Sequence, residues 1–317
     1  MRTPAMEPAR TGAPGGLMRL DRRTYVVTGA NRGLGFEVAV SLADLGADVV
    51  LAVRDLEAGQ KVADTIRTRH PAATPRVLSL DLARLESVRA FVDELDMDSV
   101  DGLVCNAAAI MVGPGRTMDG FEMHWGVNHL GHFALAATLM PALLRAPAAR
   151  VVMVTSLLAR WGRIPQDPTG MEARYRSSRA YAASKLANLV FGLELSRRAE
   201  SGGSRLISVV AHPGYARSGE RAQAPTRRTL MVTSPIRLIS QSAEAGALPI
   251  VRAAADQDLA SGSLVGPSGL LGTRGTPKVV PIFSRAKTTG LGERLWTQAE
   301  AVIGLSMPGF DRGAGPG

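Results

Sequence analysis

The sequence predicts an α/β fold in which one doubly wound parallel sheet carries helices on both faces. Short apolar segments alternate with amphipathic segments of helical spacing from residue 24 to about 215, and glycines follow the first apolar segment directly. Such alternation implies parallel strands joined by crossover helices. Hydrophobic residues make up 45% of the chain and aromatic residues only 4%, so we expect aliphatic side chains to dominate strands buried on both faces.

Each expected strand is short, mostly apolar and bounded by a turn or a charged residue. In chain order the strands are TYVVTGA (24–30), ADVVLAV (47–53), RVLSLDL (76–82), VDGLVCN (100–106), RVVMVTS (150–156) and RLISVVA (205–211). The segments between them have helical spacing, at 34–46, 55–69, 84–95, 119–144 and 178–200. Ligands of such sheets bind beyond the carboxyl ends of the strands, so the residues that follow each strand are the candidate site residues.

The chain has no internal repeat and no sharp linker, so we expect one domain over residues 21–305. Residues 1–20 are rich in Pro, Gly and Arg and lack the apolar run of a signal peptide, which predicts a disordered lead-in. Residues 306–317 are expected to form a flexible tail for the same reason. Residues 215–240 carry little secondary-structure signal, and we expect a substrate flap there.

Composition excludes several functional classes. The formal net charge is +9, but Arg is spread along the chain and does not form a basic helix or a patch with aromatic residues, so no nucleic-acid partner is expected. The single Cys105 excludes an intramolecular disulfide and a Cys-based zinc site and fits a reducing, cytoplasmic location. We expect no membrane span, because no stretch approaches the roughly 18 consecutive apolar residues required.

A glycine-rich turn follows the first expected strand and opens the first expected helix. Gly29, Gly33 and Gly35 permit a tight turn and let backbone N–H groups approach a pyrophosphate, whose charge is favoured by the helix N-terminus. A turn of this kind at this place in an alternating chain predicts a dinucleotide site.

The segment YAASK at 181–185 places a phenol and an ammonium four residues apart, on one face of a helix. The chain has only four Lys, at 61, 185, 278 and 287, so Lys185 does not look like routine surface charge. A free phenol has a pKa near 10, and a nearby cation lowers it by favouring the phenolate. Tyr181 beside Lys185 is therefore a candidate acid and base for carbonyl chemistry.

The spacing TGxxxGxG, taken with the Tyr–Lys pair, resembles the short-chain dehydrogenase/reductase family, which implies a Rossmann-like domain. Its markers occur in order over roughly residues 24 to 215: Thr28 to Gly35, Asp81-Leu82, Asn106-Ala107, Asn128, Ser156, Tyr181, Lys185 and Pro213-Gly214. GVNHLGHF (126–133) and AYAASKLAN (180–188) resemble the retinol-dehydrogenase-like branch. LVCNAA (103–108) with NHLGHF also resembles light-dependent protochlorophyllide reductase.

The resemblance implies a set of cofactor-binding residues at the strand ends. They are Gly29, Asn31, Arg32, Gly33, Leu34, Gly35, Arg54, Asp81, Leu82, Asn106, Ala107, Ala108, Tyr181, Lys185, Pro213, Gly214 and Ser218. One position departs from the family, since Ala108 stands where the usual Asn-Asn-Ala-Gly has Gly, which adds a methyl group beside the pocket.

Charge at the end of the second strand favours NADP over NAD. Enzymes that bind NAD usually place an acid there for the ribose 2′-hydroxyl, whereas this chain has Arg54, whose planar guanidinium suits a 2′-phosphate. Arg32, in the glycine turn, is a second candidate cation. In the alternative, Arg54 faces solvent and Asp55 binds the ribose, but Asp55 is better placed to cap the helix that follows.

The catalytic residues implied by the resemblance are Ser156, Tyr181, Lys185 and Asn128. Ser156 ends the fifth strand, where its hydroxyl would hydrogen-bond the substrate oxygen as charge develops. Asn128 would hold a water that links Lys185 to solvent. His129 and His132 lack the spacing partners of a metal site, so we expect packing or polar satisfaction there and no metal.

The sequence therefore predicts an NADP(H)-dependent oxidoreductase that interconverts a carbonyl and an alcohol on a small hydrophobic substrate. Apolar residues after strand ends are expected at its pocket: Met111, Leu157, Leu158, Trp161 and Ile164. One alternative is a protochlorophyllide-reductase-like double-bond reductase, although the segment from Ser156 to Tyr181 looks too short for that enzyme's insertion. Another is a non-catalytic NADP-binding scaffold. A homodimer or homotetramer is expected by resemblance.

Overall fold

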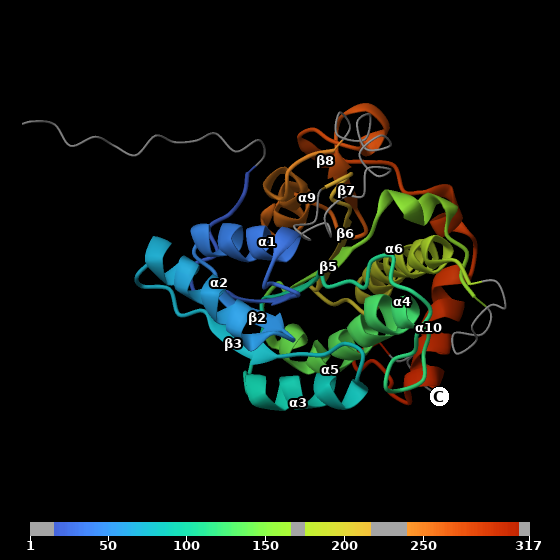
Figure 1. Ribbon diagram of the computed structural model, residues 1–317, viewed down its shortest axis with the longest axis horizontal. Helices are drawn as coiled ribbons and strands as arrows, with labels where there is room; N and C mark the ends of the chain where they lie inside the picture. The colour runs from blue at the N-terminus through green and yellow to red at the C-terminus, as the bar shows by residue number, and fades with distance from the viewer. Residues whose placement is uncertain (1–15, 166–174, 217–239, 311–317) are drawn as a thin grey trace, which may run out of the picture.

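Runs of β-branched and aliphatic residues form an eight-stranded sheet at the centre of the protein (Figure 1). The computed structural model describes residues 16–165, 175–216 and 240–310. The strands are β1 (Thr24–Thr28), β2 (Asp48–Val53), β3 (Arg76–Ser79), β4 (Gly102–Cys105), β5 (Arg150–Val154), β6 (Ile207–Ala211), β7 (Leu264–Pro267) and β8 (Pro277–Val279). The six strands expected from the sequence are all present.

The strand order is β3-β2-β1-β4-β5-β6-β7-β8, and every neighbouring pair is parallel except β7 and β8. The expected parallel sheet is therefore mostly, not entirely, parallel. Only residues 268–276 join β7 to β8, which is too short for the crossover that parallel strands need. The order reverses direction between β1 and β4, which puts a ligand crevice at the carboxyl ends of those strands.

Helices cover both faces of the sheet, as expected (Figure 1). On one face of the sheet, the helices pack on a cluster that includes Val27, Leu51 and Val152. On the other face, they pack on a cluster that includes Leu103 and Val151. The first layer contains α1 (Gly33–Asp44), α2 (Leu56–Arg69) and α9 (Ala243–Ala255). The second contains α3 (Leu85–Leu95), α5 (Gly131–Arg145), α6 (Ser177–Ser201) and α10 (Leu291–Ile303).

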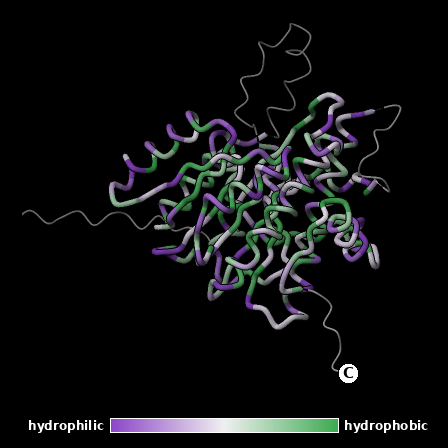
Figure 2. The backbone as a smooth tube through the Cα atoms, turned by 90° about the horizontal axis from the view of Figure 1, so that it is seen from below, coloured by the Kyte–Doolittle hydropathy of each residue, from purple (hydrophilic) through white to green (hydrophobic). Residues whose placement is uncertain are grey.

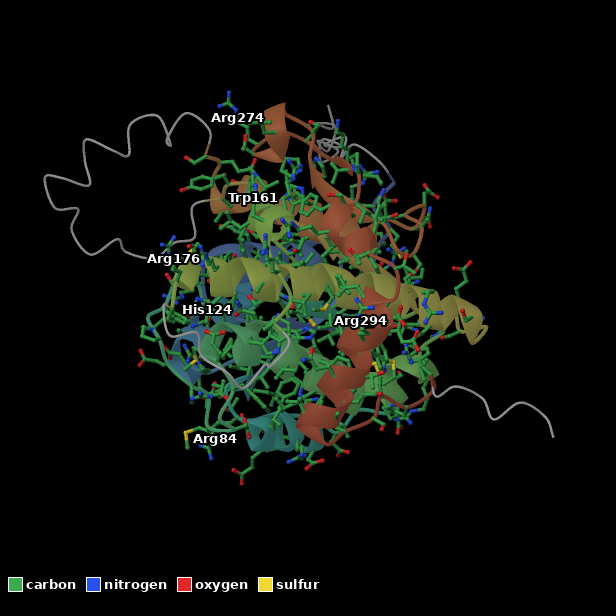
Figure 3. The ribbon with its side chains drawn as sticks, turned by 90° about the vertical axis from the view of Figure 1, so that its right-hand side faces the viewer. Arg84, His124, Trp161, Arg176, Arg274 and Arg294 are labelled. Atoms are coloured by element: carbon green, nitrogen blue, oxygen red, sulfur yellow. The ribbon has the colours of Figure 1, made fainter. Side chains whose placement is uncertain are left out.

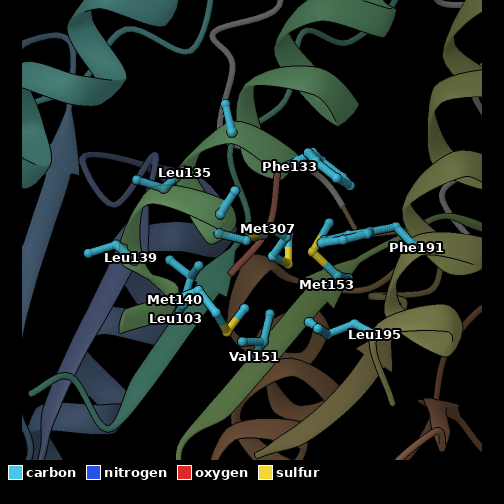
Figure 4. Packing of buried hydrophobic residues seen from close by; sticks show 14 of the residues in the cluster. Leu103, Phe133, Leu135, Leu139, Met140, Val151, Met153, Phe191, Leu195 and Met307 are labelled. Carbon is cyan, nitrogen blue, oxygen red and sulfur yellow. The ribbon is translucent and has the colours of Figure 1, made fainter. Parts of the chain in front are cut away.

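Aliphatic side chains fill the space between the sheet and the second layer. Figure 4 shows Leu103 and Val151 of the sheet packed against Phe133 and Met140 of α5 and Phe191 of α6. In Figure 2 the hydrophobic stretches of the backbone concentrate in the interior, and the hydrophilic stretches lie mostly at the periphery. This core fixes the strand ends on which the site is built.

A continuous helical segment precedes β5, at Met123–Arg145. It comprises α4 (Met123–Trp125), one π-helical turn η1 (Gly126–Leu130) and α5. By length and composition it is the one helix of the described chain that is apolar enough to cross a membrane, whereas the sequence analysis expected no such stretch. In the fold, 78% of its apolar window is buried, as is usual for the core helix of a folded domain.

Both ends of the described chain are packed, which corrects part of the expected disorder. Leu20 is fully buried, and Met18 N–H donates to the carbonyl of Ala255 across 3.0 Å. At the other end Met307 and Phe310 are buried in the core. Apolar side chains in the segments 16–20 and 306–310 outweigh their Pro and Gly content. The remaining residues of the expected lead-in and tail lie outside the described residues.

Candidate active site

The glycine turn after β1 is shaped by contacts that exclude side chains. Gly29 has φ +63° and lies against Ala107, where a Cβ would come within 3.0 Å of the Ala107 backbone. A Cβ on Gly35 would overlap the carbonyl oxygen of Gly29 and lie 2.6 Å from Nδ2 of Asn106. Gly33, with φ +56°, begins α1. The turn thus brings backbone, not side chains, to the crevice, as the sequence predicted.

The N-terminus of α1 faces the crevice without a side-chain cap. Arg32 is the N-cap residue in extended conformation, and its side chain makes no capping hydrogen bond. The first N–H groups of a helix lack intrahelical acceptors and attract anions. Asn31 and Leu34 are half-buried on either side of this start, and Leu34 also packs near Gly246 of α9. Such a helix start can bind a pyrophosphate.

The end of β2 separates Arg54 from Asp55 in the way the sequence predicted. Asp55 is the N-cap of α2, and its Oδ1 accepts a hydrogen bond from Ala58 N–H at 2.9 Å. Arg54 is exposed beside it. The capping role of Asp55 is confirmed, and it engages Oδ1 of the carboxylate. Arg54 and Asp55 are both exposed at this strand end.

The ends of β3 and β4 hold the next predicted residues. Oδ1 of Asp81 accepts a hydrogen bond from Ala83 N–H at 3.0 Å. Leu82 is buried, and its backbone oxygen lies so close to Gly131 that a Cβ there would overlap it. Asn106 donates from Nδ2 to the carbonyl of Thr28 at 2.9 Å. The carboxamide of Asn106 therefore ties the β4 end to the glycine turn. The next two residues at the end of β4, Ala107 and Ala108, are both half-buried.

Ser156, Tyr181 and Lys185 meet where β5 ends against α6. Tyr181 and Lys185 are buried, and Lys185 Nζ lies 5.9 Å from the centre of the Tyr181 ring. Nζ donates to the carbonyl of Val154 at 3.0 Å. The Ser156 side chain is close enough to that of Tyr181 to act on its pKa, and Ser156 Oγ accepts from Leu158 N–H at 3.3 Å. The predicted catalytic group is thus brought together.

Burial controls the acidity of this pair. Burial raises the pKa of Tyr181 to about 12, although the nearby Ser156 side chain opposes the rise. Burial lowers the pKa of Lys185 to about 8, against a smaller opposing effect of Cys105. The lowering of the phenol pKa by Lys185 together with the oxidised nicotinamide stays a prediction. Burial likewise raises the pKa of the free Cys105 thiol.

Asn128 lies in the π-helical turn η1 with its side chain fully engaged. Its Oδ1 accepts from Ala109 N–H at 2.7 Å, and Nδ2 donates to the carbonyl of Ala109 and to Ser184 Oγ, both at 3.0 Å. The side chain therefore clamps the loop after β4 to α6. The predicted relay through a water at Asn128 stays a prediction.

The turn after β6 is held from two sides. Gly214 has φ +66°, and a Cβ there would collide with the carbonyl of Thr273. The carbonyl of Pro213 accepts from Gln241 Nε2 at 2.7 Å. Tyr215 N–H donates to the carbonyl of Thr273 at 2.8 Å, so this turn is held in place. Its predicted contact with the nicotinamide stays a prediction. Ser218 and most of the expected flap, at 217–239, lie outside the described residues.

The apolar residues predicted to line the substrate pocket are partly or largely exposed. Trp161 is 67% exposed and Met111 43% exposed, the latter with φ +52°. Leu157, Leu158 and Ile164 are half-buried near them in sequence. These residues were predicted to line a pocket, and the exposure of Trp161 and Met111 leaves apolar surface available there.

Sequence reasoning missed a polar cluster beside Tyr181. Glu122 Oε1 accepts from His124 N–H and lies 3.0 Å from His124 Nδ1, and Tyr175 OH donates to the same oxygen at 2.9 Å. The His124 ring meets the Tyr181 ring edge-on, with 6.1 Å between centroids. Figure 3 shows His124 near the end of α6 where Arg176 lies. A Glu two residues before a His gives no signal of such a cluster.

His129 and His132 are buried, and the described residues contain no cluster of three metal-ligating side chains. His129 packs among Trp125, Phe133 and Phe191, whereas both ring nitrogens of His132 have polar partners. His129 therefore shows the expected packing, and His132 shows the expected hydrogen bonding of a buried polar side chain.

Comparison with known proteins gives a consistent set of relatives. Residues 23–228 match a family model described as short chain dehydrogenase. The chain is 35% identical to retinol dehydrogenase 14 of Homo sapiens, across 95% of this chain and 92% of that protein. It is 42% identical to retinol dehydrogenase 11 of Homo sapiens, but that match spans only 63% of each chain.

Solved structures extend the comparison to nearly the whole fold. A protein of Mycobacterium paratuberculosis is 38% identical with a TM-score of 0.76, and the match covers 92% of this chain and 97% of that one. A short-chain dehydrogenase of Escherichia coli CFT073, solved with NADPH, is 25% identical with a TM-score of 0.61 over 78% of this chain and 96% of that one.

Proposed function

The chain belongs to the short-chain dehydrogenase family, in its retinol-dehydrogenase-like branch, and we propose that it is an NADP(H)-dependent enzyme interconverting an apolar alcohol with its carbonyl form. The observation that supports this most is the meeting of Ser156, Tyr181 and Lys185 at the same crevice edge as the glycine turn. A nucleotide-binding turn alone would serve a scaffold equally well. A buried Tyr–Lys–Ser group beside it has a catalytic use.

NADP(H) fits the groups at the strand ends. The start of α1 at Gly33 and the backbone of the glycine turn would bind the pyrophosphate. Arg54 and Arg32 would bind the 2′-phosphate, since the carboxylate of Asp55 is engaged in capping α2. The backbone of Pro213 and Gly214 would hold the nicotinamide carboxamide. A relative of known structure that binds NADPH supports the same choice.

The chain's own residues would move one proton. When bound, NADPH supplies the hydride that reduces the carbonyl carbon. Tyr181 gives its phenolic proton to the carbonyl oxygen, while the hydroxyl of Ser156 donates a hydrogen bond to that oxygen as negative charge develops. Lys185, held on the carbonyl of Val154, stabilises the phenolate left behind. In the oxidative direction the same groups act in reverse.

The substrate is proposed to be apolar. Trp161 and Met111, which are exposed and follow strand ends in the sequence, would supply surface for an apolar chain or ring. Several of the relatives carry the name retinol dehydrogenase, which suggests an apolar alcohol and its aldehyde. We further propose a cytoplasmic protein that forms a homodimer or homotetramer, which fractionation and light scattering of the purified chain would test.

An NADPH-oxidation screen over apolar aldehydes and ketones tests the proposal. We expect Tyr181→Phe to lose at least about a hundredfold in kcat, the usual contribution of general acid catalysis, with NADPH binding retained. The exposed, salt-bridged Lys61 offers a matched control for Lys185, as Lys61→Met should keep full turnover whereas Lys185→Met should not. Turnover of protochlorophyllide only under light would favour the double-bond reductase, and NADPH binding with no turnover would favour the scaffold.

A further inference from the structure

A closed set of hydrogen bonds surrounds the loop after β4. At one end of the loop, Asn106 N–H and Ala107 N–H both donate to Thr28 Oγ1 at 2.9 Å. At the other end, Ala109 exchanges two hydrogen bonds with the side chain of Asn128. Thr28 is the last residue of β1, where the glycine turn begins, and Asn128 lies in η1.

His132 joins these two holding residues. Its Nε2 lies 2.9 Å from Thr28 Oγ1, and its Nδ1 lies 3.0 Å from the backbone oxygen of Asn128. The side chains of Thr28, Asn128 and His132 are all buried. The imidazole therefore connects the start of the glycine turn to the π-helical turn.

The hydrogen bond to Asn128 fixes the tautomer of a neutral His132 ring. A backbone oxygen can only accept, so Nδ1 carries the proton that it donates to Asn128. A hydroxyl oxygen has two lone pairs, and those of Thr28 Oγ1 are used by the two backbone N–H donors. Two acceptors then face the Thr28 proton, Nε2 at 2.9 Å and the carbonyl oxygen of Val104 at 3.3 Å, and Nε2 is the nearer. The neutral ring with Nδ1 protonated satisfies both ends.

The chain of hydrogen bonds continues into the catalytic helix. Asn128 Nδ2 donates to Ser184 Oγ, and the Ser184 hydroxyl donates to the carbonyl of Tyr181 at 2.9 Å. The path thus runs from the backbone N–H of Ala107, beside Gly29, to the residue that carries the phenol. Each step has a donor and an acceptor of the required kind.

We propose that His132 is a positioning residue that holds the coenzyme-binding turn at its Nε2 end and the catalytic helix at its Nδ1 end. This inference rests on the proposed function, because only that function makes the glycine turn a coenzyme-binding turn and α6 a catalytic helix. The titratable groups that face the ring are Lys185 of α6 and His129 of η1. Burial lowers the pKa of His132 to about 4, the bond to Asn128 opposes this and Lys185 adds to it, so the ring stays neutral at physiological pH.

Three substitutions separate the two ends of His132. His132→Asn keeps a donor near the position of Nδ1 and loses the acceptor for Thr28, whereas His132→Gln can keep that acceptor and loses the donor to Asn128. His132→Leu loses both. The matched control is His129→Leu, since His129 is an equally buried imidazole whose two nitrogens have no hydrogen-bond partner among the residues that the structure describes.

We expect His132→Asn to raise the Kd for NADPH roughly tenfold with little loss of kcat at saturating NADPH. His132→Gln should lower kcat by a similar factor and leave Kd near the wild-type value, and His132→Leu should do both. Thr28→Val removes every hydrogen bond of Oγ1, including the one to His132, so adding His132→Asn should raise Kd no further than Thr28→Val alone. His129→Leu should change neither quantity beyond twofold. Equal effects of the Asn and Gln variants on both quantities, or additive effects with Thr28→Val, would overturn the proposal.

A readout that needs no coenzyme separates this proposal from the proposed function. The ¹⁵N spectrum of the wild-type ring should show a protonated Nδ1 and an unprotonated Nε2, and an imidazolium or the other tautomer would overturn the bridge. Thr28→Val and His132→Asn should also be non-additive in the free energy of unfolding. If the wild type neither binds nor oxidises NADPH, the proposed function fails while these two measurements still decide whether the bridge exists.

Discussion

Lys185 donates a hydrogen bond from Nζ to the backbone oxygen of Val154, 3.0 Å away. That oxygen also accepts from Asn188 Nδ2 at 3.2 Å, so the last residue of β5 fixes two side chains of α6. The ammonium of Lys185 is buried without a carboxylate partner among the described residues. Burying this unpaired charge beside Tyr181 lowers the free energy of unfolding of the protein.

This cost predicts a dependence of stability on pH. The pKa of Lys185 is about 8 in the folded protein, against an ordinary value of 10.5. Between these values the unfolded state binds more protons, so the free energy of unfolding rises with pH. Relative to Lys185→Met, which cannot titrate, we expect a gain of about 1–3 kcal/mol across this window, measured by urea denaturation.

The tyrosines set the upper limit of that window. Burial raises the pKa of Tyr25 and of Tyr181 to about 12, so the unfolded state loses these protons first above pH 10 and stability falls again there. The fall occurs in both proteins and cancels in the comparison. Parallel curves for the wild type and Lys185→Met between pH 8 and 10 would contradict the lowered pKa of Lys185.

Sequence spacing predicted the parts of the site that are local. The glycine turn, the cap at Asp55 and the Tyr181–Lys185 pair each lie within one short segment, so their geometry follows from turn and helix periodicity. The alternation of segments gave six strands and the helices on both faces. β7 and the antiparallel β8 were not among the six expected strands, because both lie beyond the alternating segments that end at about residue 215.

The rest of the site depends on residues far apart in the chain. Thr28 and His132 are 104 positions apart, and Glu122 and Tyr175 are 53 apart, so no spacing rule connects them. The acidity of Tyr181 also could not be predicted, because spacing reveals a nearby cation but not the extent of burial. In this protein burial has the larger effect on that pKa.

Coenzyme preference should depend on Arg54. Arg54→Asp replaces a cation with an anion at the β2 end, which repels a 2′-phosphate and can accept from a ribose 2′-hydroxyl. We expect the KM for NADPH to rise by roughly ten- to a hundredfold and the preference to move toward NADH. Steady-state kinetics with both coenzymes measures this.

The control for Arg54 is its neighbour. Asp55→Ser removes the carboxylate but keeps a residue that caps α2, so coenzyme preference should be unchanged. A shift in preference with Asp55→Ser, and none with Arg54→Asp, would mean that Asp55 binds the ribose after all.

Gly35 should tolerate no side chain. A Cβ there would overlap the carbonyl oxygen of Gly29 and lie 2.6 Å from Asn106 Nδ2, so Gly35→Ala must displace the turn. We expect about 2–4 kcal/mol of destabilisation, measured by thermal unfolding, with loss of NADPH binding. Gly113→Ala is the matched control, because a Cβ at Gly113 meets no atom within 4 Å. Equal stability of the two variants would show that the turn adapts.

The Glu122 cluster should support both the start of α4 and the position of Tyr181. Burial raises the pKa of Glu122, but hydrogen bonds from His124, Trp125 and Tyr175 outweigh it, so the pKa lies below its ordinary value of 4.5. The charged form is therefore the stabilising one. Its contribution is present above pH 4.5 and is lost as the pH falls through the folded-state pKa.

Substitutions at the two ends of this cluster should differ in size. Glu122→Gln loses the charge that accepts four hydrogen bonds, and we expect about 1–3 kcal/mol of destabilisation at neutral pH, whereas Tyr175→Phe removes one donor and should cost about 1 kcal/mol. Because the His124 ring contacts that of Tyr181, kcat should fall in Glu122→Gln while the Kd for NADPH stays unchanged. Glu57→Gln, at an exposed ion pair with Lys61, should alter neither. If Glu122→Gln were as stable and active as Glu57→Gln, the cluster would have no part in holding Tyr181.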